Sequence, residues 1–222
     1  MTTGIRILLV DDQALIRLGF RMVLEEEKDF AVVGEAGDGE EAVRAVERHR
    51  PDVVLMDVRM PRTDGIAATE QIVRAHPDAR VLVLTTFDLD EYAFAAIRAG
   101  ASGFLLKDAQ RYELVAAIRA VHRGDASLSP RVTRRLIELV GRTPEPVPQH
   151  DPTASLTDRE RDVFLAIGRG RTNGEIAAEL FLSESTVKTH VGRVLAKLEA
   201  RDRVHAVVLA HRLGLVPPED PA

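Results

Sequence analysis

Short apolar runs rich in Val, Leu and Ile alternate with amphipathic stretches through the first 124 residues. The runs have the length of strands, and the stretches between them repeat apolar residues at helical spacing. Because parallel strands need crossover helices, this alternation predicts an α/β doubly wound fold with a five-stranded parallel sheet covered on both faces. The expected strands are 5–10, 30–36, 52–57, 80–86 and 103–107, and the expected helices are 13–27, 39–49, 65–75, 89–99 and 110–123.

The pattern changes after residue 124. Residues 127–140 read as one more helix, with Ser129 as N-cap and Pro130 at the first position. Residues 141–154 contain four prolines and no periodic apolar pattern, which is typical of an extended, semi-rigid tether. We therefore expect a first domain over 4–124 and a linker over 125–152.

The last part of the chain, 153–217, is predicted to be an all-α domain of four helices. Thr157 and Glu160 have the spacing of a capping box before the first of these helices. A short turn around Leu182 joins the second and third, which predicts a helix-turn-helix over about 176–195. The expected helices are 158–169, 172–181, 184–199 and one within 201–216.

Composition narrows the classes of function. With 45% hydrophobic and 29% charged residues, the chain is an ordinary globular protein. It has no Cys, which excludes disulfides, thiolate zinc sites and cysteine nucleophiles, and its seven His lack the spacing of a zinc site. We expect a cytoplasmic protein without membrane contact, because no apolar run approaches ~18 residues and no signal-peptide pattern is present.

Charge is spread unevenly along the chain. Residues 153–216 carry 10 basic and 8 acidic side chains, a net +2, which leaves −7 for the remainder. An acidic front and a mildly basic back indicate two units with different partners.

Polar residues stand where the predicted strands end. Asp11 and Asp12 follow the first strand, Asp57 ends the third, Thr85 lies near the end of the fourth, and Lys107 ends the fifth. In doubly wound sheets the carboxyl ends of the strands form the ligand site, so these side chains are expected to converge.

Each of these residues alone has an ordinary explanation, as a helix cap, a turn former, a β-branched strand residue or a solvated charge. Together they do not, because three close carboxylates raise one another's pKa unless a cation keeps them ionised. Mg²⁺ suits such a site, since it binds one or two carboxylates, waters and a phosphate oxygen.

The segments LLVDD, LMDVRMPRTDG, LTT and GASGFLLKDA resemble the receiver domain of two-component response regulators, a flavodoxin-like fold, over 4–124. The resemblance implies a role for each residue of this rim. Asp57 is the phospho-acceptor, assisted by Thr85 and Lys107; Thr85 and Phe104 are the switch pair; Asp11, Asp12, Asp57 and the backbone carbonyl of Arg59 bind Mg²⁺.

By this resemblance Asp57 is a carboxylate nucleophile that accepts a phosphoryl group from a kinase phosphohistidine or a small phosphodonor. Thr85 is then drawn toward the phosphoryl group and Phe104 turns inward, which changes the surface around 87–107. The bias of such a switch is of order 1 to 3 kcal/mol. The chemistry is on the protein itself, so no turnover of an external substrate is expected.

The predicted helix 184–199 has two distinct faces. One is a core stripe of Val187, Val191, Val194, Leu195 and Leu198. The other carries Lys188, Thr189, Gly192, Arg193 and Ala196, with no acidic residue. Cations suit phosphates and guanine edges, and Thr suits base edges, so the second face is predicted to read DNA.

The segment LTDRERDVFLAIGRGRTNGEIAAELFLSESTVKTHVGRVLAKL resembles the LuxR-type DNA-binding domain, over 153–217. The resemblance implies that Lys188, Thr189 and Gly192 face the bases, that Ser183, Ser185, Arg193 and Lys197 contact or approach phosphates, and that Val204, Val207, Val208 and His211 form a dimer contact. A dimer on DNA implies two half-sites.

Both resemblances together identify a NarL/FixJ-like response regulator. They imply a sensor histidine kinase and double-stranded promoter DNA as partners, a homodimer on DNA, and RNA polymerase as a candidate partner. A phosphorylation-independent LuxR-type transcription factor with a degenerate receiver is the alternative. The complete set of Asp11, Asp12, Asp57, Thr85 and Lys107 argues against it. A haloacid-dehalogenase-like phosphatase would need a second Asp where Arg59 stands.

Overall fold

The computed structural model describes residues 4–85, 89–124 and 152–216. The chain divides into two compact units, Met1–Leu128 and Ser129–Ala222, and each is described by itself. The helix predicted over 127–140, with its cap Ser129, lies outside the described residues. So does the predicted tether up to residue 151, after which a short 3-10 helix, η1 (Pro152–Ser155), begins the second unit's described part.

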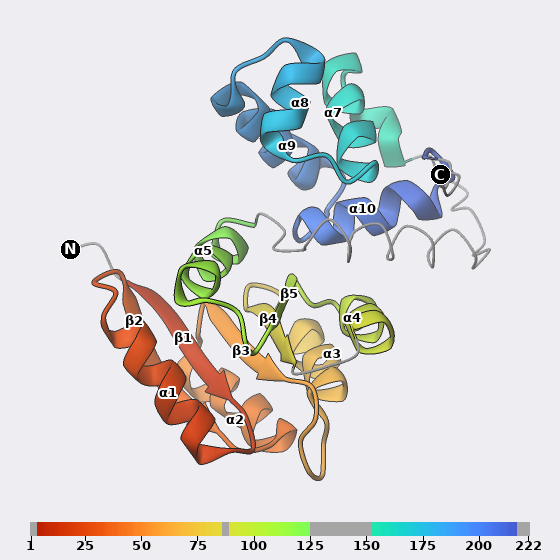
Figure 1. The fold of residues 1–222 in the computed structure, drawn as a ribbon. Helices are drawn as coiled ribbons and strands as arrows, with labels where there is room; N and C mark the ends of the chain where they lie inside the picture. Colours follow the sequence, from red (N-terminus) through yellow and green to blue (C-terminus); the bar gives the residue numbers. More distant parts are fainter. Residues whose placement is uncertain (1–3, 86–88, 125–151, 217–222) are drawn as a thin grey trace. The chain divides into compact units, whose positions relative to one another are not determined.

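The first unit contains a five-stranded parallel sheet in the order β2-β1-β3-β4-β5, which confirms the predicted α/β doubly wound fold (Figure 1). The strand order reverses between β1 and β3, and this is the place where such sheets bind ligands. The strands are β1 (Ile5–Val10), β2 (Phe30–Ala36), β3 (Val53–Asp57), β4 (Arg80–Thr85) and β5 (Gly103–Leu106).

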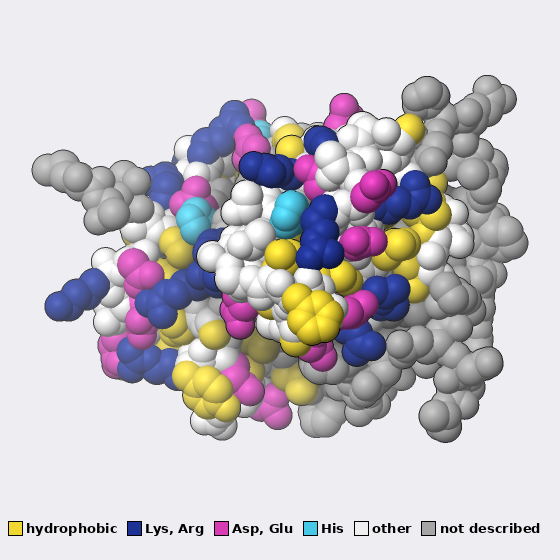
Figure 2. Space-filling view, turned by 90° about the horizontal axis from the view of Figure 1, so that it is seen from above, with side chains coloured by type: hydrophobic (Ala, Val, Ile, Leu, Met, Phe, Trp, Pro, Cys, Tyr) yellow, Lys and Arg dark blue, Asp and Glu magenta, His cyan; other side chains and the backbone are white. Residues whose placement is uncertain are grey.

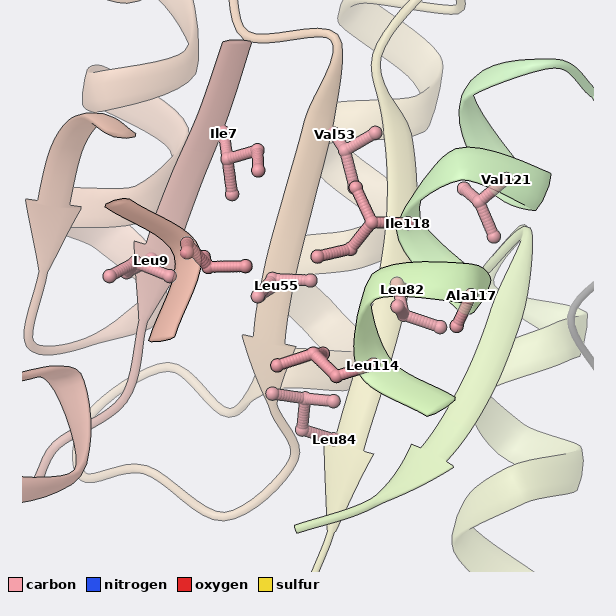
Figure 3. Packing of buried hydrophobic residues seen from close by; sticks show 11 residues of the cluster. Ile7, Leu9, Val53, Leu55, Leu82, Leu84, Leu114, Ala117, Ile118 and Val121 are labelled. Carbon is pink, nitrogen blue, oxygen red and sulfur yellow. The ribbon is translucent and has the colours of Figure 1, made fainter. Parts of the chain in front are cut away.

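The central strands of the sheet are buried on both faces, as their continuous apolar runs require, whereas the edge strand β2 is mostly half-buried or exposed. All five residues of β3 are buried. In Figure 3, Leu114, Ile118 and neighbouring side chains of α5 point onto Leu55, Leu82 and Leu84 of the sheet. The helices are α1 (Ala14–Glu25), α2 (Gly39–His49), α3 (Gly65–Ala75), α4 (Leu89–Arg98) and α5 (Arg111–His122).

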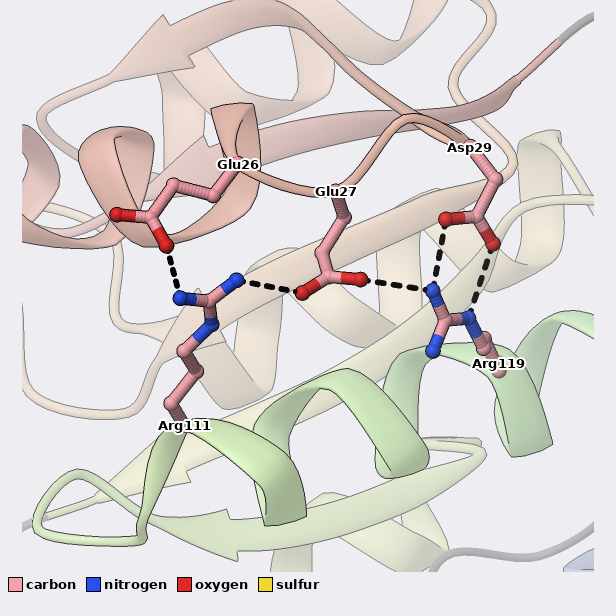
Figure 4. A network of polar contacts seen from close by, with 5 residues as sticks. All are labelled: Glu26, Glu27, Asp29, Arg111 and Arg119. Atoms are coloured by element: carbon pink, nitrogen blue, oxygen red, sulfur yellow. Dashed lines mark hydrogen bonds and ion pairs between the residues drawn. The ribbon is translucent and has the colours of Figure 1, made fainter.

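Two arginines of α5 tie that helix to the segment between α1 and β2 (Figure 4). Arg111 pairs with Glu26 and, at 2.7 Å, with Glu27. Arg119 lies 2.9 Å from the other oxygen of Glu27 and 2.7 Å from Asp29. The guanidinium of Arg111 and then that of Arg119 lower the pKa of Glu27. Isolated surface ion pairs stabilise little, but here one carboxylate is shared by two cations, which fixes α5 beside the end of α1.

The second unit consists of short capped helices packed on one apolar core. In each helix the N-cap side chain accepts a hydrogen bond from the backbone N–H three residues on; the caps are Thr157, Thr172, Ser183 and Asp202. The predicted capping box of Thr157 and Glu160 is confirmed. The helices are α7 (Asp158–Gly168), α8 (Asn173–Leu180), α9 (Glu184–Lys197) and α10 (Arg203–Arg212).

Figure 2 shows side chains of both charges, Lys and Arg as well as Asp and Glu, on the surface of the described residues in view. No helix of the described segments has the length and apolar character needed to cross a membrane.

Candidate functional site

Three carboxylates meet at the carboxyl ends of β1 and β3. These strands are neighbours in the sheet, with Val10 opposite Met56, so Asp11, Asp12 and Asp57 leave the sheet side by side. One carboxylate oxygen from each of the three lies within 4.8 Å of the others. Asp11 and Asp57 are buried, whereas Asp12 is exposed. The acidic pocket, as we call these three residues with Lys107, is therefore open on the side of Asp12.

Lys107 reaches this pocket from the end of β5. Its Nζ lies 2.6 Å from Oδ2 of Asp11 and 2.9 Å from Oδ2 of Asp57. Its backbone N–H donates a hydrogen bond of 2.8 Å to the carbonyl of Thr85, the last residue of the intervening β4. Thr85 is itself buried. The predicted convergence of strand ends is thus present, with one ammonium between two carboxylates.

Burial and charge compete in this pocket. Burial raises the pKa of Asp57, and the nearby Asp11 adds to that, while Lys107 lowers it; the balance is a raised pKa. Burial also lowers the pKa of Lys107, but its contacts with Asp11 and Asp57 outweigh this, and its pKa is raised. Three ionised carboxylates and one ammonium leave two uncompensated negative charges, so the pocket is suited to a divalent cation.

The donor atoms also fit such a cation. Mg²⁺ prefers oxygen ligands, keeps several waters, and is held by few carboxylates together with phosphate oxygens. Beside the ammonium of Lys107, the pocket supplies carboxylate oxygens from two buried residues and one exposed residue. A cavity of about 470 Å³ adjoins it, lined by Asp12, Val58, Arg59, Met60, Pro61, Asp64, Ile66 and Tyr92. The pocket therefore has both the ligands for Mg²⁺ and space beside it for a phosphorylated donor.

Gly65 closes the loop that follows Asp57. Its N–H donates a hydrogen bond of 2.9 Å to the carbonyl of Val58. A Cβ at Gly65 would lie 1.8 Å from the backbone oxygen of Asp57, which no side chain can tolerate. Glycine is required here by this close approach and not by its φ angle.

We expect Gly65→Ala to displace the loop and destabilise the first unit by about 1–3 kcal/mol or more, the range typical of overpacking. The midpoints of thermal unfolding of wild type and Gly65→Ala measure this loss of stability. Gly19→Ala is the matched control, because a Cβ at Gly19 meets nothing within 4 Å and Ala is favoured in a helix. An unfolding midpoint for Gly65→Ala equal to that of the control would contradict the close approach.

The second unit presents the predicted DNA face on α9. Val187, Val191 and Val194 are buried on its inner side. Lys188, Thr189, Gly192, Arg193 and Ala196 are all exposed. Around Gly192 the space is open. Ser183, at the N-cap, lies 2.8 Å from the hydroxyls of both Ser185 and Thr186. The helix thus separates its core stripe from the face that the sequence assigns to DNA, while the DNA contacts themselves stay a prediction.

Comparison with known families accounts for both units. The response regulator receiver domain matches residues 7–119, and the bacterial regulatory proteins of the luxR family match 154–210. This chain belongs to the response-regulator family. A response regulator of this kind joins a receiver domain to a LuxR-type DNA-binding domain, as predicted from the sequence.

Relatives match this response regulator over nearly its whole length. The transcriptional regulatory protein YxjL of Bacillus subtilis (strain 168), described as uncharacterized, is 46% identical over 96% of this chain and 97% of its own. LiaR of the same organism is 42% identical over 96% and 99%. The crystal structure of response regulator ChrA from a heme-sensing two-component system is 36% identical, with a TM-score of 0.52, over 96% and 99%.

Three of the four residues predicted to form the dimer contact are buried. Val204 and Val207 are 2% and 3% exposed. His211 is also buried, and its Nε2 lies 2.8 Å from the carbonyl oxygen of Gly168 in α7. These three side chains therefore do not form the exposed surface that the prediction requires. Only Val208, which is half-buried, remains a candidate.

Lys197, which the sequence predicts to contact or approach phosphates, has a carboxylate partner in the structure, and its phosphate contact stays a prediction. Its Nζ lies 2.6 Å from Oε2 of Glu160, a residue of α7 that is 3% exposed. The Lys197 ammonium, followed by the backbone N–H of Thr157, lowers the pKa of Glu160 to about 2. Lys197 thus joins α9 to α7.

This ion pair predicts a dependence of stability on acid. Because the folded-state pKa of Glu160, about 2, lies below its ordinary value of 4.5, the ionised form stabilises the fold above pH 4.5 and the effect is lost as pH falls toward 2. We expect Glu160→Gln to melt at a lower temperature than wild type at pH 7, and this difference to shrink between pH 5 and pH 3. Calorimetry at the three pH values tests it, and a constant difference would contradict it.

Other contacts near the pocket could not be found from the sequence. Nη1 of Arg17 donates a hydrogen bond of 2.6 Å to the carbonyl of Asp11, and its Nε lies 3.0 Å from Glu35. Arg62 forms an ion pair with the buried Asp38. These partners are brought together by the sheet and by the loop after β3, and no local pattern marks them. Phe104, the predicted switch aromatic, is buried, as a core aromatic would also be.

Proposed function

We propose that phosphorylation of Asp57 by a sensor histidine kinase controls DNA binding by the α9 face, and through it transcription. Mg²⁺ would be held by Asp11, Asp12, Asp57 and the backbone carbonyl of Arg59. The convergence of the three carboxylates within 4.8 Å, with Lys107 contacting two of them, carries this proposal.

The residues of the pocket divide the chemistry among them. An oxygen of Asp57 attacks phosphorus, the bond from phosphorus to the histidine nitrogen of the donor breaks, and the histidine leaves. Lys107, which already touches Asp57, is placed to pair with a phosphoryl oxygen once the carboxylate has been esterified. Mg²⁺ bound in the pocket would neutralise negative charge on the phosphoryl oxygens. The reaction modifies the protein itself, and we expect no turnover of another substrate.

The phosphoryl group would change the balance of charges among the residues of the acidic pocket. A phosphoryl group brings about −1.5 to −2 charge and three acceptor oxygens, whereas Asp57 loses its own negative charge. The proposed switch responds through Thr85 at the end of β4 and Phe104 in β5, which are neighbouring strands. The receiver then alters dimerisation or the availability of the DNA-binding unit, which acts as a homodimer on two half-sites. We further propose that the protein acts in the cytoplasm and that RNA polymerase is a candidate partner.

The test is phosphorylation of the full chain with acetyl phosphate and Mg²⁺. We expect a phosphoryl adduct in the intact mass, peptide mapping that locates it at Asp57, and no adduct when EDTA replaces Mg²⁺. Footprinting on a DNA site identified by genome-wide binding of this protein should change in the phosphorylated sample. An adduct without any change in footprint would overturn the control of DNA binding, and the same footprint without any adduct would favour the phosphorylation-independent regulator.

A further inference from the structure

Arg62 adopts a backbone conformation that arginine disfavours. It lies in the β3–α3 loop (residues 58–64), directly after the phospho-acceptor, with a φ of 65°. This left-handed region suits glycine, and a long side chain there costs conformational free energy. Such outliers persist where surrounding contacts hold them, and they gather at functional sites. The contacts of Arg62 therefore indicate what its conformation serves.

The contacts join the loop to the start of α2. The Arg62 guanidinium forms an ion pair with Oδ2 of Asp38, whose side chain is 2% exposed. The other oxygen of Asp38 caps α2 by accepting a hydrogen bond of 2.8 Å from the N–H of Glu41. Next to this pair, the N–H of Gly39 donates a hydrogen bond of 3.1 Å to the carbonyl of Thr63. The far side of the loop is thus attached to α2 at two successive residues.

The near side of the same loop closes on the acidic pocket. Gly65 packs against the Asp57 carbonyl, and its N–H bonds to Val58. The backbone N–H of Arg59 donates a hydrogen bond to the Asp57 carboxylate, which partly opposes the rise in the pKa of Asp57 that burial causes. Arg59 is also the residue whose carbonyl would bind the metal. The position of the loop between α2 and Asp57 therefore sets where that carbonyl lies.

We propose that Arg62 is a positioning residue for phosphorylation: its ion pair with Asp38 holds the β3–α3 loop so that the Arg59 backbone completes the metal site. This inference rests on the proposed function. Without the guanidinium, Oδ2 of Asp38 would be buried without its ion partner, which is unfavourable. The strained backbone at Arg62 would also lose the contact that compensates for it, so the loop would relax away from the metal position.

Four variants test the pair. Arg62→Gln and Asp38→Asn each remove one charge, and Asn is as good an N-cap as Asp, so α2 keeps its start. The double variant completes a mutant cycle. Arg62→Gly removes the side chain but suits the backbone angle. Arg74→Gln is the control, since it breaks a surface pair with Glu70, of 3.2 Å, on α3.

The readouts are the Mg²⁺ dissociation constant from an NMR titration of backbone amides with Mg²⁺ alone, and the Mg²⁺ concentration giving half the maximal rate with acetyl phosphate. Removing a residue that orients a metal ligand typically weakens binding about 10-fold or more. We expect about that increase in both quantities for Arg62→Gln, Asp38→Asn and Arg62→Gly. The double variant should be no weaker than the single ones, and the control should match wild type.

Different failures have different meanings. If the Mg²⁺ dissociation constants of Arg62→Gln and Asp38→Asn stay within twofold of wild type while their melting temperatures fall, the pair is structural only and the inference is wrong. If Arg62→Gly binds Mg²⁺ as well as wild type does, the backbone angle matters and the ion pair does not. If wild type binds Mg²⁺ but acquires no phosphoryl group, the proposed function fails while the NMR titration still tests Arg62.

Discussion

Replacing Asp57 by Asn is expected to abolish the phosphoryl adduct and, without Mg²⁺, to raise the melting temperature of the receiver. The loss of the adduct follows because an amide is not a nucleophile for phosphorus. The gain in stability follows from the raised pKa of Asp57. Burial is the main cause of this rise in pKa, and the nearby charge of Asp11 adds to it. A carboxyl whose pKa is higher in the folded than in the unfolded state destabilises the fold at every pH above both values, so neutralising it at pH 7 removes that cost.

Mg²⁺ should reverse the order of these two melting temperatures. A ligand that binds only the folded protein stabilises it by RT ln(1 + [L]/Kd), and the variant has lost one of three carboxylate ligands. Intact mass and calorimetry with and without Mg²⁺ measure both effects. Glu70→Gln is the matched control, because it also removes one carboxylate charge from the first unit, but Glu70 does not line the cavity and only makes an exposed pair with Arg74, at 3.2 Å. An adduct on the Asp57→Asn protein would place the acceptor elsewhere.

The receiver fold could be predicted closely because each strand is a short run made mainly of apolar residues, and the central strands β3 and β4 are almost wholly buried. The run VVLMD is β3 itself, fully buried, and its polar end is where the pocket forms. Once the order of strands and helices is known, a general rule places Asp11, Asp57 and Lys107 at one edge. That rule gives the edge but not the contacts, and the ammonium between two carboxylates is a property of the folded chain.

What the sequence could not supply are pairings between distant segments. Glu160 and Lys197 are 37 positions apart, and each has an ordinary local explanation as a capping residue or a solvated cation. The partner of the apolar stripe of α10 could not be predicted from the sequence either. Val204, Val207 and His211 recur at helical spacing, which marks a buried face without saying whether the chain itself or a second copy covers it. The structure shows them buried, with His211 bonded to α7.

Two lysines on α9 provide the sharpest test of the DNA face, because each substitution removes one positive charge from the same helix. Lys188 is exposed, whereas Lys197 is paired with Glu160. We expect Lys188→Ala to weaken specific binding roughly 5- to 150-fold, the ~1–3 kcal/mol of a base-edge contact. Lys197→Ala should mainly lower the melting temperature of the DNA-binding unit, because it leaves the carboxylate of Glu160 without its partner.

The salt dependence of binding separates these roles. Each phosphate neutralised by a cation steepens the fall of affinity with salt by about one unit of log–log slope, so a lysine held by a carboxylate should contribute little. Binding isotherms of wild type and both variants, measured over a range of salt concentrations on specific and unrelated DNA, give the slopes. A slope reduced by about one in Lys197→Ala would show that its pair with Glu160 opens on DNA. Equal loss on specific and unrelated DNA in Lys188→Ala would assign that lysine to the phosphate backbone instead of the bases.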